Sequence, residues 1–374
     1  MSLVDGSRGA AALTPLVHFL LQLLFSSLLL MFPTSFSCSN GACQVLESCV
    51  AATDCGPGLY CGNCPALGKN QPFCTRGQAT MPTSIIGGLP FNKYTWLVTH
   101  NSFSIVDAPS LPGVQRMTFY NQEDTVTNQL RNGVRGLMLD MYDFEGDIWL
   151  CHSFRGQCFN FTAFMPKKGE DWPTVTEMVQ DNHRLLVFTS DASKEAEQGV
   201  AYQWKYLVEN ESGDPGVVHG SCPNRKESKP LNSRSPSLFL MNYFPTYPVQ
   251  ADACKEHSTP LTEMVGTCFK AAGHVMPNFL AVNFYMRSDG GGVFDALDRM
   301  NGQLMCGCST VAACQAGAPY GSCKNISLPP RSPVTNPAGS FSGFVQFTNS
   351  AFSVHPQDYF WALIFFALLM AYFP

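Results

Sequence analysis

The chain has 374 residues, of which 45% are hydrophobic, and a formal net charge of −5. This length allows one large domain or two smaller ones, and the apolar content is sufficient for a core. No basic cluster is present, so we expect no nucleic-acid partner, and an anionic substrate would need local positive charge rather than a global field.

Residues 1–37 have the features of a secretory signal peptide. Arg8 lies in the first part, residues 16–32 form an apolar run with few polar interruptions, and Ser35 and Ser37 suit a cleavage site before Cys38. The alternative is a membrane anchor. It is less favoured because a second hydrophobic segment closes the chain.

Cysteines indicate an oxidising compartment. All 16 follow residue 37, and seven of them lie in residues 38–78, a module with too little apolar content to fold without disulfides. Because seven is odd, at least one of these cysteines pairs outside the module or stays free. Cys61-Gly62-Asn63-Cys64 also has the spacing of a zinc or redox site, but structural disulfides are favoured in a secreted chain.

Three short apolar runs that end in polar residues follow, at 94–103, 133–143 and 148–153. Glu145-Gly146-Asp147 predicts a three-residue turn and a hairpin, with Phe144 facing Ile148 and Asp140 facing His152. With His100 on the preceding strand, two imidazoles and a carboxylate would surround one pocket. Such a set suits acid–base chemistry on a phosphate ester, although each residue alone is more often structural.

Residues 85–325 alternate between strand and helix patterns, which predicts an α/β fold with a mainly parallel sheet. The expected strands are 184–190, 238–243 and 279–285, and the expected helices are 195–209, 261–272 and 293–300. The glycine run at 290–292 is read as a tight turn, with a phosphate cradle as the weaker alternative.

Further patterns agree with a secreted protein. Cys151 and Cys158 bracket a short loop and could pair, and four later cysteines at 306–323 form a second disulfide-rich patch. The sequons predict glycosylation at Asn160, Asn210 and Asn325.

The end of the chain predicts a lipid anchor. A flexible linker occupies 326–349, and residues 350–374 combine a moderately polar spacer with an apolar tail that is short for a membrane span. With Asn349 as the attachment residue, this order is that of a glycosylphosphatidylinositol (GPI) signal. We therefore expect the protein on the outer face of the plasma membrane.

Several motifs carry a resemblance to a known family. They are Trp96-Leu97-Val98-Thr99-His100-Asn101-Ser102-Phe103, Asn132 to Asp143, Asp147 to Ser153, Asp171 to Val175, Arg184 to Ser190 and Asn283 to Gly292. Over roughly 38–325 the chain resembles the X-domain of phosphatidylinositol-specific phospholipase C, and more closely the plant branch of secreted, lipid-anchored phospholipase C-like phosphodiesterases.

The resemblance implies a TIM-type (β/α) barrel and phosphodiester cleavage, with an inositol phospholipid or related diester as substrate. His100 would deprotonate the attacking hydroxyl, His152 would protonate the leaving oxygen, and Asp140 would orient an imidazole or hold a metal. Substrate contacts are expected from Arg135, Tyr142, Asn283, Tyr285 and Arg287.

The chain departs from the family pattern at the metal and phosphate positions. Metal-independent members have Arg where Tyr142 stands, and calcium-dependent members have Glu where Met138 stands. Asn101 and Asp140 remain as a partial calcium site, which is few ligands for an ion that takes six to eight. No cofactor is certain, and calcium is the candidate.

A larger departure follows Phe164, where a helix and a strand of the family are missing. The barrel is therefore expected to be incomplete, with an exposed edge. Two hypotheses result: a surface phosphodiesterase, or a degenerate barrel that acts as a binding or wall-associated protein. A glycerophosphodiesterase is a third, supported only by the layout of Asp140 and His152.

Overall fold

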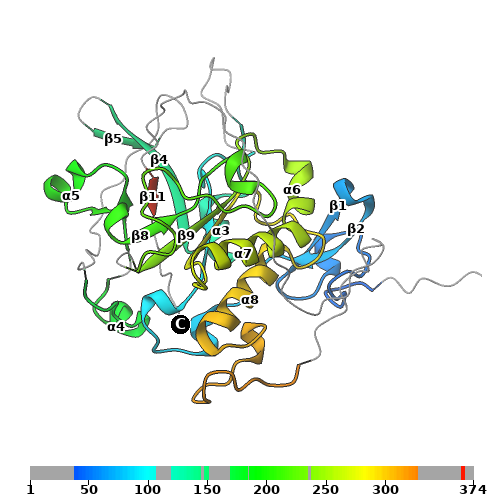
Figure 1. Ribbon diagram of the computed structural model, residues 1–374. Coiled ribbons are helices and arrows are strands. Elements are labelled where there is room, and N and C mark those ends of the chain that lie inside the picture. The colour runs from blue at the N-terminus through cyan, green and yellow to red at the C-terminus, as the bar shows by residue number, and fades with distance from the viewer. Residues whose placement is uncertain are drawn as a thin grey trace, which may run out of the picture.

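A curled, mainly parallel β-sheet forms the centre of the molecule, and a small two-stranded sheet lies at its side (Figure 1). The computed structural model describes residues 38–106, 119–144, 147–150, 169–183, 185–234, 237–326 and 364–366. The strands are β1 (Leu59–Cys64), β2 (Lys69–Arg76), β3 (Trp96–Thr99), β4 (Gly136–Phe144), β5 (Asp147–Leu150), β6 (Phe188–Thr189), β7 (Ala201–Tyr202), β8 (Leu207–Glu209), β9 (Leu238–Tyr243), β10 (Phe279–Val282) and β11 (Ile364–Phe366). The helices are α2 (Pro82–Ile85), α3 (Val126–Arg131), α4 (Val175–Gln180), α5 (Ser193–Gln198), α6 (Gln250–Glu256), α7 (Thr259–Ala271) and α8 (Gly292–Cys306).

The parallel strands lie in the order β4, β3, β10, β9, β8. The first of them in the chain, β3, therefore pairs with both the next one, β4, and the last one, β10, as neighbours do in a barrel. Strands β6 and β7 form a separate parallel pair. The prediction of an α/β fold is confirmed, and the described strands form a curled half-barrel rather than a closed TIM-type barrel.

Both faces of the sheet are buried, which is why β3, β9 and β10 are continuous apolar runs. One face carries Trp96, Leu240 and Phe279, which pack in a cluster rich in aromatic side chains. The opposite face lies under α7 and α8 (Figure 1). Helix α7 buries residues spaced three and four apart, namely Leu261, Met264, Val265 and Cys268.

The predicted helices at 261–272 and 293–300 are confirmed as α7 and α8, but the helix predicted over 195–209 is wrong beyond Gln198. Helix α5 ends at Gly199, whose φ of +65° is the left-handed conformation that favours glycine at a helix end. The Val- and Tyr-containing stretch after it forms β7 and β8, in keeping with its β-propensity.

Two predicted strands are shorter than expected. The one predicted at 184–190 is reduced to β6, and the one at 279–285 ends at Val282. Phe284 has a φ of +41°, which a β-strand cannot accommodate. The chain therefore turns away from the sheet directly after β10.

The predicted hairpin of β4 and β5 is confirmed, but its register is wrong by one residue. Phe144 pairs with Asp147, and Met141 pairs with Leu150. Two residues rather than three therefore separate the strands, a loop length that matches the twist of β-hairpins well. Because side chains alternate between faces, this slip removes the predicted pairing of Asp140 with His152. His152 itself lies outside the described residues, as do Cys151 and Cys158.

The incomplete barrel is expected to have an exposed edge, and of the two edges of the parallel strands the outer edge of β4 is paired. Strand β11 runs antiparallel to it, with Ile364 opposite Asp140 and Phe366 opposite Met138. Strand β11 belongs to the segment predicted as the GPI signal, and the rest of residues 350–374 lies outside the described part. No described helix combines the length and apolar character that a membrane crossing requires.

The cysteine-rich module forms the β1–β2 hairpin with three internal disulfides, Cys38–Cys43, Cys49–Cys61 and Cys55–Cys74. The seventh cysteine, Cys64, pairs with Cys254 on α6, which confirms that one cysteine of the module pairs outside it. Cys61 and Cys64 thus have different partners, so their spacing reflects neither a zinc site nor a redox pair. Cys222–Cys268, Cys306–Cys314 and Cys308–Cys323 complete the described disulfides.

Ion pairs also fix the module to the sheet domain. Arg76 on β2 donates from Nη1 to Asp295 at 2.9 Å and to Asp298 at 2.7 Å, both on α8. The Tyr60 hydroxyl donates to the Met286 carbonyl, and the Arg76 amide donates to the Gly290 carbonyl at 2.8 Å. The glycine run at 290–292 is therefore part of a structural contact and turn, as its favoured interpretation predicts.

Replacing both Cys64 and Cys254 with serine should destabilise the protein more than replacing Cys38 and Cys43. The first disulfide closes a separation of 190 residues and the second closes one of 5, and the denatured chain loses more entropy when a longer loop is closed. We expect a loss of about 2–4 kcal/mol for the long loop, measured by urea unfolding. Peptide mapping without reduction that failed to find a Cys64–Cys254 peptide would contradict the connectivity.

Candidate functional site

A cavity of about 350 Å³ opens at the carboxyl ends of the parallel strands. Catalytic residues of β/α barrels lie at this end of the sheet. The cavity is lined by His100, Asn101, Phe119, Asn121, Met138, Asp140, Ser212, Gly213, Arg225, Phe244, Pro245, Thr246 and Pro248. It thus brings together three residues that the sequence predicts for the site, His100, Asn101 and Asp140.

His100 directly follows β3 and is held on three sides. Its backbone N–H donates to the Val282 carbonyl at 2.9 Å, which extends the pairing with β10 by one residue. Its imidazole stacks on Phe244, with 3.7 Å between the ring centroids and 5° between the planes. Its Nδ1 lies 2.9 Å from Oδ1 of Asn283. The ring is therefore fixed in position and in orientation.

Buried amides surround Nδ1 of His100. Asn283 Oδ1 also accepts a hydrogen bond from Asn121 Nδ2 at 3.0 Å, and Asn121 Oδ1 accepts from Asn101 Nδ2 at 3.4 Å. Nδ1 also lies 3.3 Å from the Asn121 Nδ2 donor, farther than the 2.9 Å to Asn283 Oδ1. Because Asn283 Oδ1 can only accept, the shorter contact favours the neutral tautomer with the proton on Nδ1 and the lone pair on Nε2. This tautomer gives His100 a nitrogen that can act as a base.

Two residues of this network, Asn121 and Gln122, were not identified by the sequence analysis. Gln122 donates from Nε2 to the carbonyls of His100 at 2.9 Å and Val282 at 3.1 Å, and thereby joins β3 to β10. The Asn121 carbonyl accepts from the Phe284 amide at 2.8 Å. Asn121 and Gln122 follow no strand motif, so their sequence gives no signal of this role.

Asp140 lies on β4 and is half-buried at the wall of the same cavity. Burial raises the pKa of its carboxyl to about 6. A carboxyl that titrates near neutrality in a cleft is typical of functional sites, because it can take up or give a proton at working pH.

Arg225 contributes positive charge to the cavity wall, and the sequence analysis did not identify it. Its Nη1 donates to Oε1 of Glu209 at 2.9 Å, and the Glu209 side chain is fully buried at the end of β8. Asn242 on β9 donates to the same oxygen at 2.7 Å. The guanidinium also lies over the Trp204 ring, 5.5 Å from its centroid. The Arg225 head group is therefore fixed in place.

Three residues predicted to contact the substrate lie away from this cavity. Arg135 precedes β4, at the other end of the sheet, and donates to the carbonyls of Leu130 and Val134, both at 2.8 Å. The Tyr285 hydroxyl donates to Asp124 at 2.8 Å, and Arg287 forms a bidentate ion pair with Glu123. All three stabilise the fold through these contacts. The Tyr142 side chain lies outside the described part.

Calcium does not fit the described residues. Asn101 Oδ1 is buried and has no hydrogen-bond partner among the described residues, and Asp140 lines the same cavity. These two residues can therefore offer oxygen ligands. Calcium takes six to eight, and Met138 presents a thioether to the same cavity where an acid would add a ligand. The described clusters of three candidate metal ligands centre on cysteines that form disulfides.

The sequon at Asn210 is a misleading signal. Its side chain is fully buried, and it donates to the Asn242 carbonyl at 3.0 Å while its Oδ1 accepts from the Asn242 amide at 2.7 Å. A glycan on this nitrogen would break these bonds and would need space that the interior lacks. Asn325 is exposed, and Asn160 lies outside the described residues.

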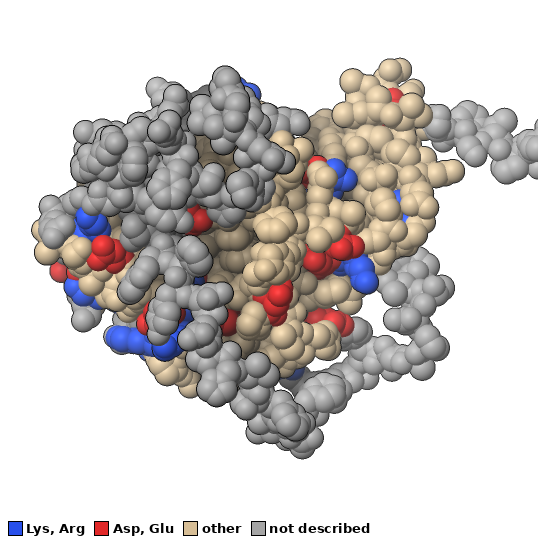
Figure 2. Space-filling view, turned by 90° about the horizontal axis from the view of Figure 1, so that it is seen from above, with Lys and Arg blue, Asp and Glu red and all other residues tan. Residues whose placement is uncertain are grey.

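The surface charges are mixed. On the face that Figure 2 shows, basic side chains lie beside acidic ones rather than in a separate patch. Elsewhere in the described part, ion pairs such as Arg287–Glu123 and Lys205–Glu195 show the same arrangement. Arg225 is itself paired with Glu209 and Glu227, and its guanidinium belongs to the wall of the His100 cavity.

Comparison with known proteins gives one strong likeness. A PI-PLC X domain-containing protein of Arabidopsis thaliana is 63% identical over 387 residues, which cover 87% of this chain and 91% of that protein. No family model and no solved structure matches the chain. Because 87% of 374 residues is about 325, roughly 60 of the 387 positions have no counterpart here. An internal deletion of some tens of residues, as the sequence indicates after Phe164, accounts for such a difference.

Replacing Asn283 with Asp should keep the His100 imidazole protonated to higher pH. A carboxylate 2.9 Å from Nδ1 favours the imidazolium, whereas the amide of Asn283 carries no charge. The measurement is an NMR titration of the histidine ring signals in the parent and the variant. Asn325→Asp, which adds the same charge at an exposed site, is the control and should leave His100 unchanged; an equal response in both variants would contradict the contact.

Replacing Asp140 with Asn should stabilise the protein at neutral pH but not in acid. The pKa of Asp140 is about 6 when folded and 3.8 as a model value, so the folded state binds more protons between these values. The contribution of this carboxyl to stability is therefore complete below about pH 4 and is lost as the pH rises through about 6. The variant should gain at most about 3 kcal/mol near pH 8 and nothing near pH 3.5.

Urea unfolding of the two proteins at both pH values measures this difference. Asp171→Asn is the matched control, because Asp171 is exposed. A gain for Asp140→Asn that is the same at both pH values would point to packing rather than to titration.

Proposed function

Because the chain belongs to the PI-PLC X domain-containing proteins, we propose that it is a phosphoric diester hydrolase of the phospholipase C type. The observation that carries this proposal is that His100, with its imidazole held by Asn283 and Phe244, and Asp140 line one cavity at the carboxyl ends of the strands. A base and a titratable acid in one cleft suit a displacement at phosphorus.

The proposed reaction breaks one ester bond. His100 Nε2 takes the proton of a hydroxyl, which in an inositol phospholipid is the ring hydroxyl next to the phosphate. The hydroxyl oxygen forms a bond to phosphorus, the bond from phosphorus to the glycerol oxygen breaks, and an acid protonates that oxygen. His152 is the acid that the family resemblance implies.

Arg225 supports a phosphate substrate. The phospholipase C members that need no metal place an arginine at the position of Tyr142 to neutralise the phosphate. In this chain a guanidinium reaches the cavity from a different strand end, fixed by Glu209 and by Trp204. Arg225 can thus stabilise the negative charge that develops on the phosphate oxygens.

A binding protein is the second candidate function. It is favoured by the half-barrel sheet and by the thioether of Met138 in the cavity, because neither contributes to catalysis. Catalytic groups need packed neighbours that hold them within about 0.5 Å. The observed contacts of His100 with Phe244, Asn283 and Val282 supply such support, and for this reason the enzyme is the preferred proposal.

We also propose that the protein acts on the outer face of the plasma membrane, held by a lipid anchor. Three features support this proposal: residues 1–37 resemble a signal peptide, the protein contains disulfides, and residues 349–374 run from small residues through a polar spacer to an apolar tail. Treatment of intact cells with an anchor-cleaving phospholipase should release the protein into the medium. Retention in the membrane fraction would oppose the anchor.

The activity prediction is that His100→Ala and His152→Ala each lower turnover of phosphatidylinositol vesicles by about 10²–10⁴, the usual contribution of a positioned acid or base. The double variant should lose little more than either single variant, because both groups serve one transition state. His219→Ala is the control, since His219 is exposed and pairs with Glu263. The assay is run with added calcium and with a chelator. Turnover that is absent in the parent under both conditions would favour the binding protein.

A further inference from the structure

A second, larger cavity of about 520 Å³ lies at the amino-terminal end of the sheet, opposite the cavity of His100. Its walls include the first residues of β9, Leu238 and Phe239, together with Asn278, which precedes β10, and Asn92 and Lys93, which precede β3. Nothing in the proposed reaction uses this end of the sheet. The volume is within the range of small-molecule sites.

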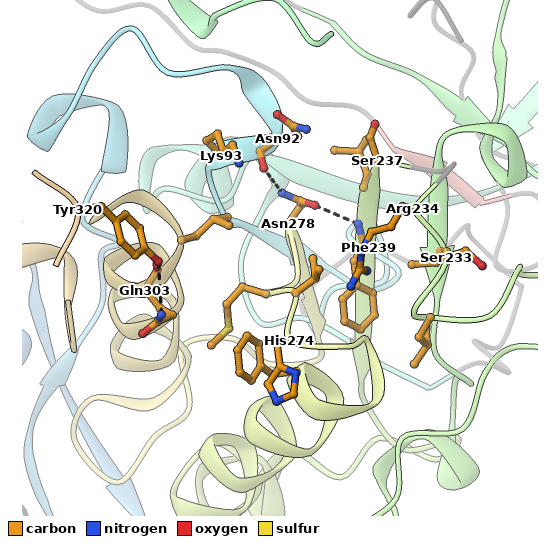
Figure 3. Close-up of a pocket in the computed structure, with 17 residues that line it drawn as sticks. Asn92, Lys93, Ser233, Arg234, Ser237, Phe239, His274, Asn278, Gln303 and Tyr320 are labelled. Atoms are coloured by element: carbon orange, nitrogen blue, oxygen red, sulfur yellow. Dashed lines mark hydrogen bonds between the residues drawn. The ribbon is translucent and has the colours of Figure 1, made fainter. Parts of the chain in front are cut away.

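The charged groups of this cavity share one sign. Lys93 and Arg234 are its cations, His274 adds an imidazole, and no Asp or Glu is among the described residues that line it. Figure 3 shows Lys93, Arg234 and His274 on different sides of the cavity, so that they surround its space. All three residues are exposed, so an anion from solution can reach them.

Arg234 is held in place by the end of α7. It donates from Nη1 to the Ala272 carbonyl at 3.1 Å and from Nη2 to the Gly273 carbonyl at 2.9 Å. A Cβ on Gly273 would lie 2.9 Å from Nη2, so the glycine leaves room for this guanidinium. These bonds use two of its five N–H groups. The head group is thus fixed, with donors left for a ligand.

Lys93 and His274 have unused hydrogen-bonding capacity. Within the described residues, neither the Lys93 ammonium nor a ring nitrogen of His274 has a hydrogen-bond partner. His274 has a φ of +66°, an uncommon conformation for a residue with a side chain, and its ring meets Phe269 edge to face at 5.2 Å. His274 thus combines a strained backbone conformation with an imidazole at the cavity wall.

The remaining wall combines aromatic and polar groups. Tyr320 is 67% exposed, and its hydroxyl donates to the Gln303 carbonyl at 2.7 Å, which fixes the ring at the rim. Ser233, Ser237 and the Gln303 amide add neutral donors and acceptors. Aromatic faces suit the C–H surfaces of a sugar, amides and hydroxyls suit its hydroxyl groups, and a fixed guanidinium suits a carboxylate or phosphate.

We propose that this cavity binds an anionic sugar unit, with Arg234 and Lys93 on the anionic group and Tyr320 beside the ring. The carboxylate of a uronic acid and the phosphate of a sugar phosphate share this chemistry. The site would attach the protein to an acidic saccharide while the opposite end of the sheet stays accessible.

Calorimetric titration of the purified protein tests the proposal with three probes: digalacturonate, glucose 6-phosphate and neutral lactose. At least one anionic probe should bind saturably and lactose should not, and the stronger anionic probe identifies the anionic group. Added salt should weaken binding. Lactose binding as tight as the anions, or no binding of any probe, would overturn the proposal.

Variants test the named residues. Lys93→Gln alone and Lys93→Gln with Arg234→Gln should weaken the anionic probe, the double variant by about tenfold or more, because each loses a charge-assisted hydrogen bond. Lys255→Gln makes the same charge change at an exposed site on α6 and should bind as the parent does. Because the Lys93 ammonium has no partner among the described residues, its single variant remains informative even if loss of Arg234 destabilises α7. Unchanged affinity in both variants would overturn the assignment.

Discussion

The pairing of β3 with both β4 and β10 is the constraint on which the rest of the structure depends. It places the ends of three strands side by side, and so brings His100 after β3 next to Asn283 after β10 and near the cavity that Asp140 on β4 lines. The three residues are separated by up to 183 positions in the chain. Gln122 reinforces this pairing, since its amide bridges the carbonyls of His100 and Val282.

The described groups around Nδ1 of His100 are polar but neutral. The group that holds Nδ1 is an amide rather than a carboxylate, and the next shell is again amides, Asn121 and Asn101. An amide fixes the tautomer without stabilising an imidazolium, so the positive charge that forms on the ring during proton transfer must be stabilised elsewhere. The face of Phe244, stacked on the imidazole, can contribute through its negative quadrupole. The backbone strain at Phe284 is maintained here because its amide donates to Asn121.

The two ends of the sheet have different chemistry. At the carboxyl ends lie a titratable acid, an imidazole and a guanidinium that is already paired with Glu209. At the amino ends, the described lining holds bases without acids and an exposed aromatic rim. The module is fixed at the side by Cys64–Cys254 and by the ion pairs of Arg76 with Asp295 and Asp298 on α8. It therefore leaves the lining of both cavities to the sheet domain.

Local patterns were sufficient to predict part of this protein. Continuous apolar runs predicted the buried strands β3 and β9, and three-and-four spacing predicted α7. The odd number of cysteines predicted that one of them pairs outside the module or stays free, and Cys64 pairs outside it. His100 and Asp140 were found because they end or follow recognisable strands, and Asn101 because it matches the family motif. Each of these signals is local, because it depends only on a few neighbouring residues in the sequence.

Only the tertiary structure decided the rest, because it depends on contacts between distant residues. A loop of two residues instead of three set the register of β4 and β5, a choice that the turn residues alone do not fix. Arg135, Tyr285 and Arg287 have the residue types of a phosphate site but are used in the contacts of the fold. Arg225, Asn121 and the basic cavity have no motif, since they become neighbours of the sites only when the strands curl. Asn210 is the opposite case. The sequence contains a complete sequon there, but the Asn210 side chain is buried between β8 and β9, and this burial arises only when the chain folds.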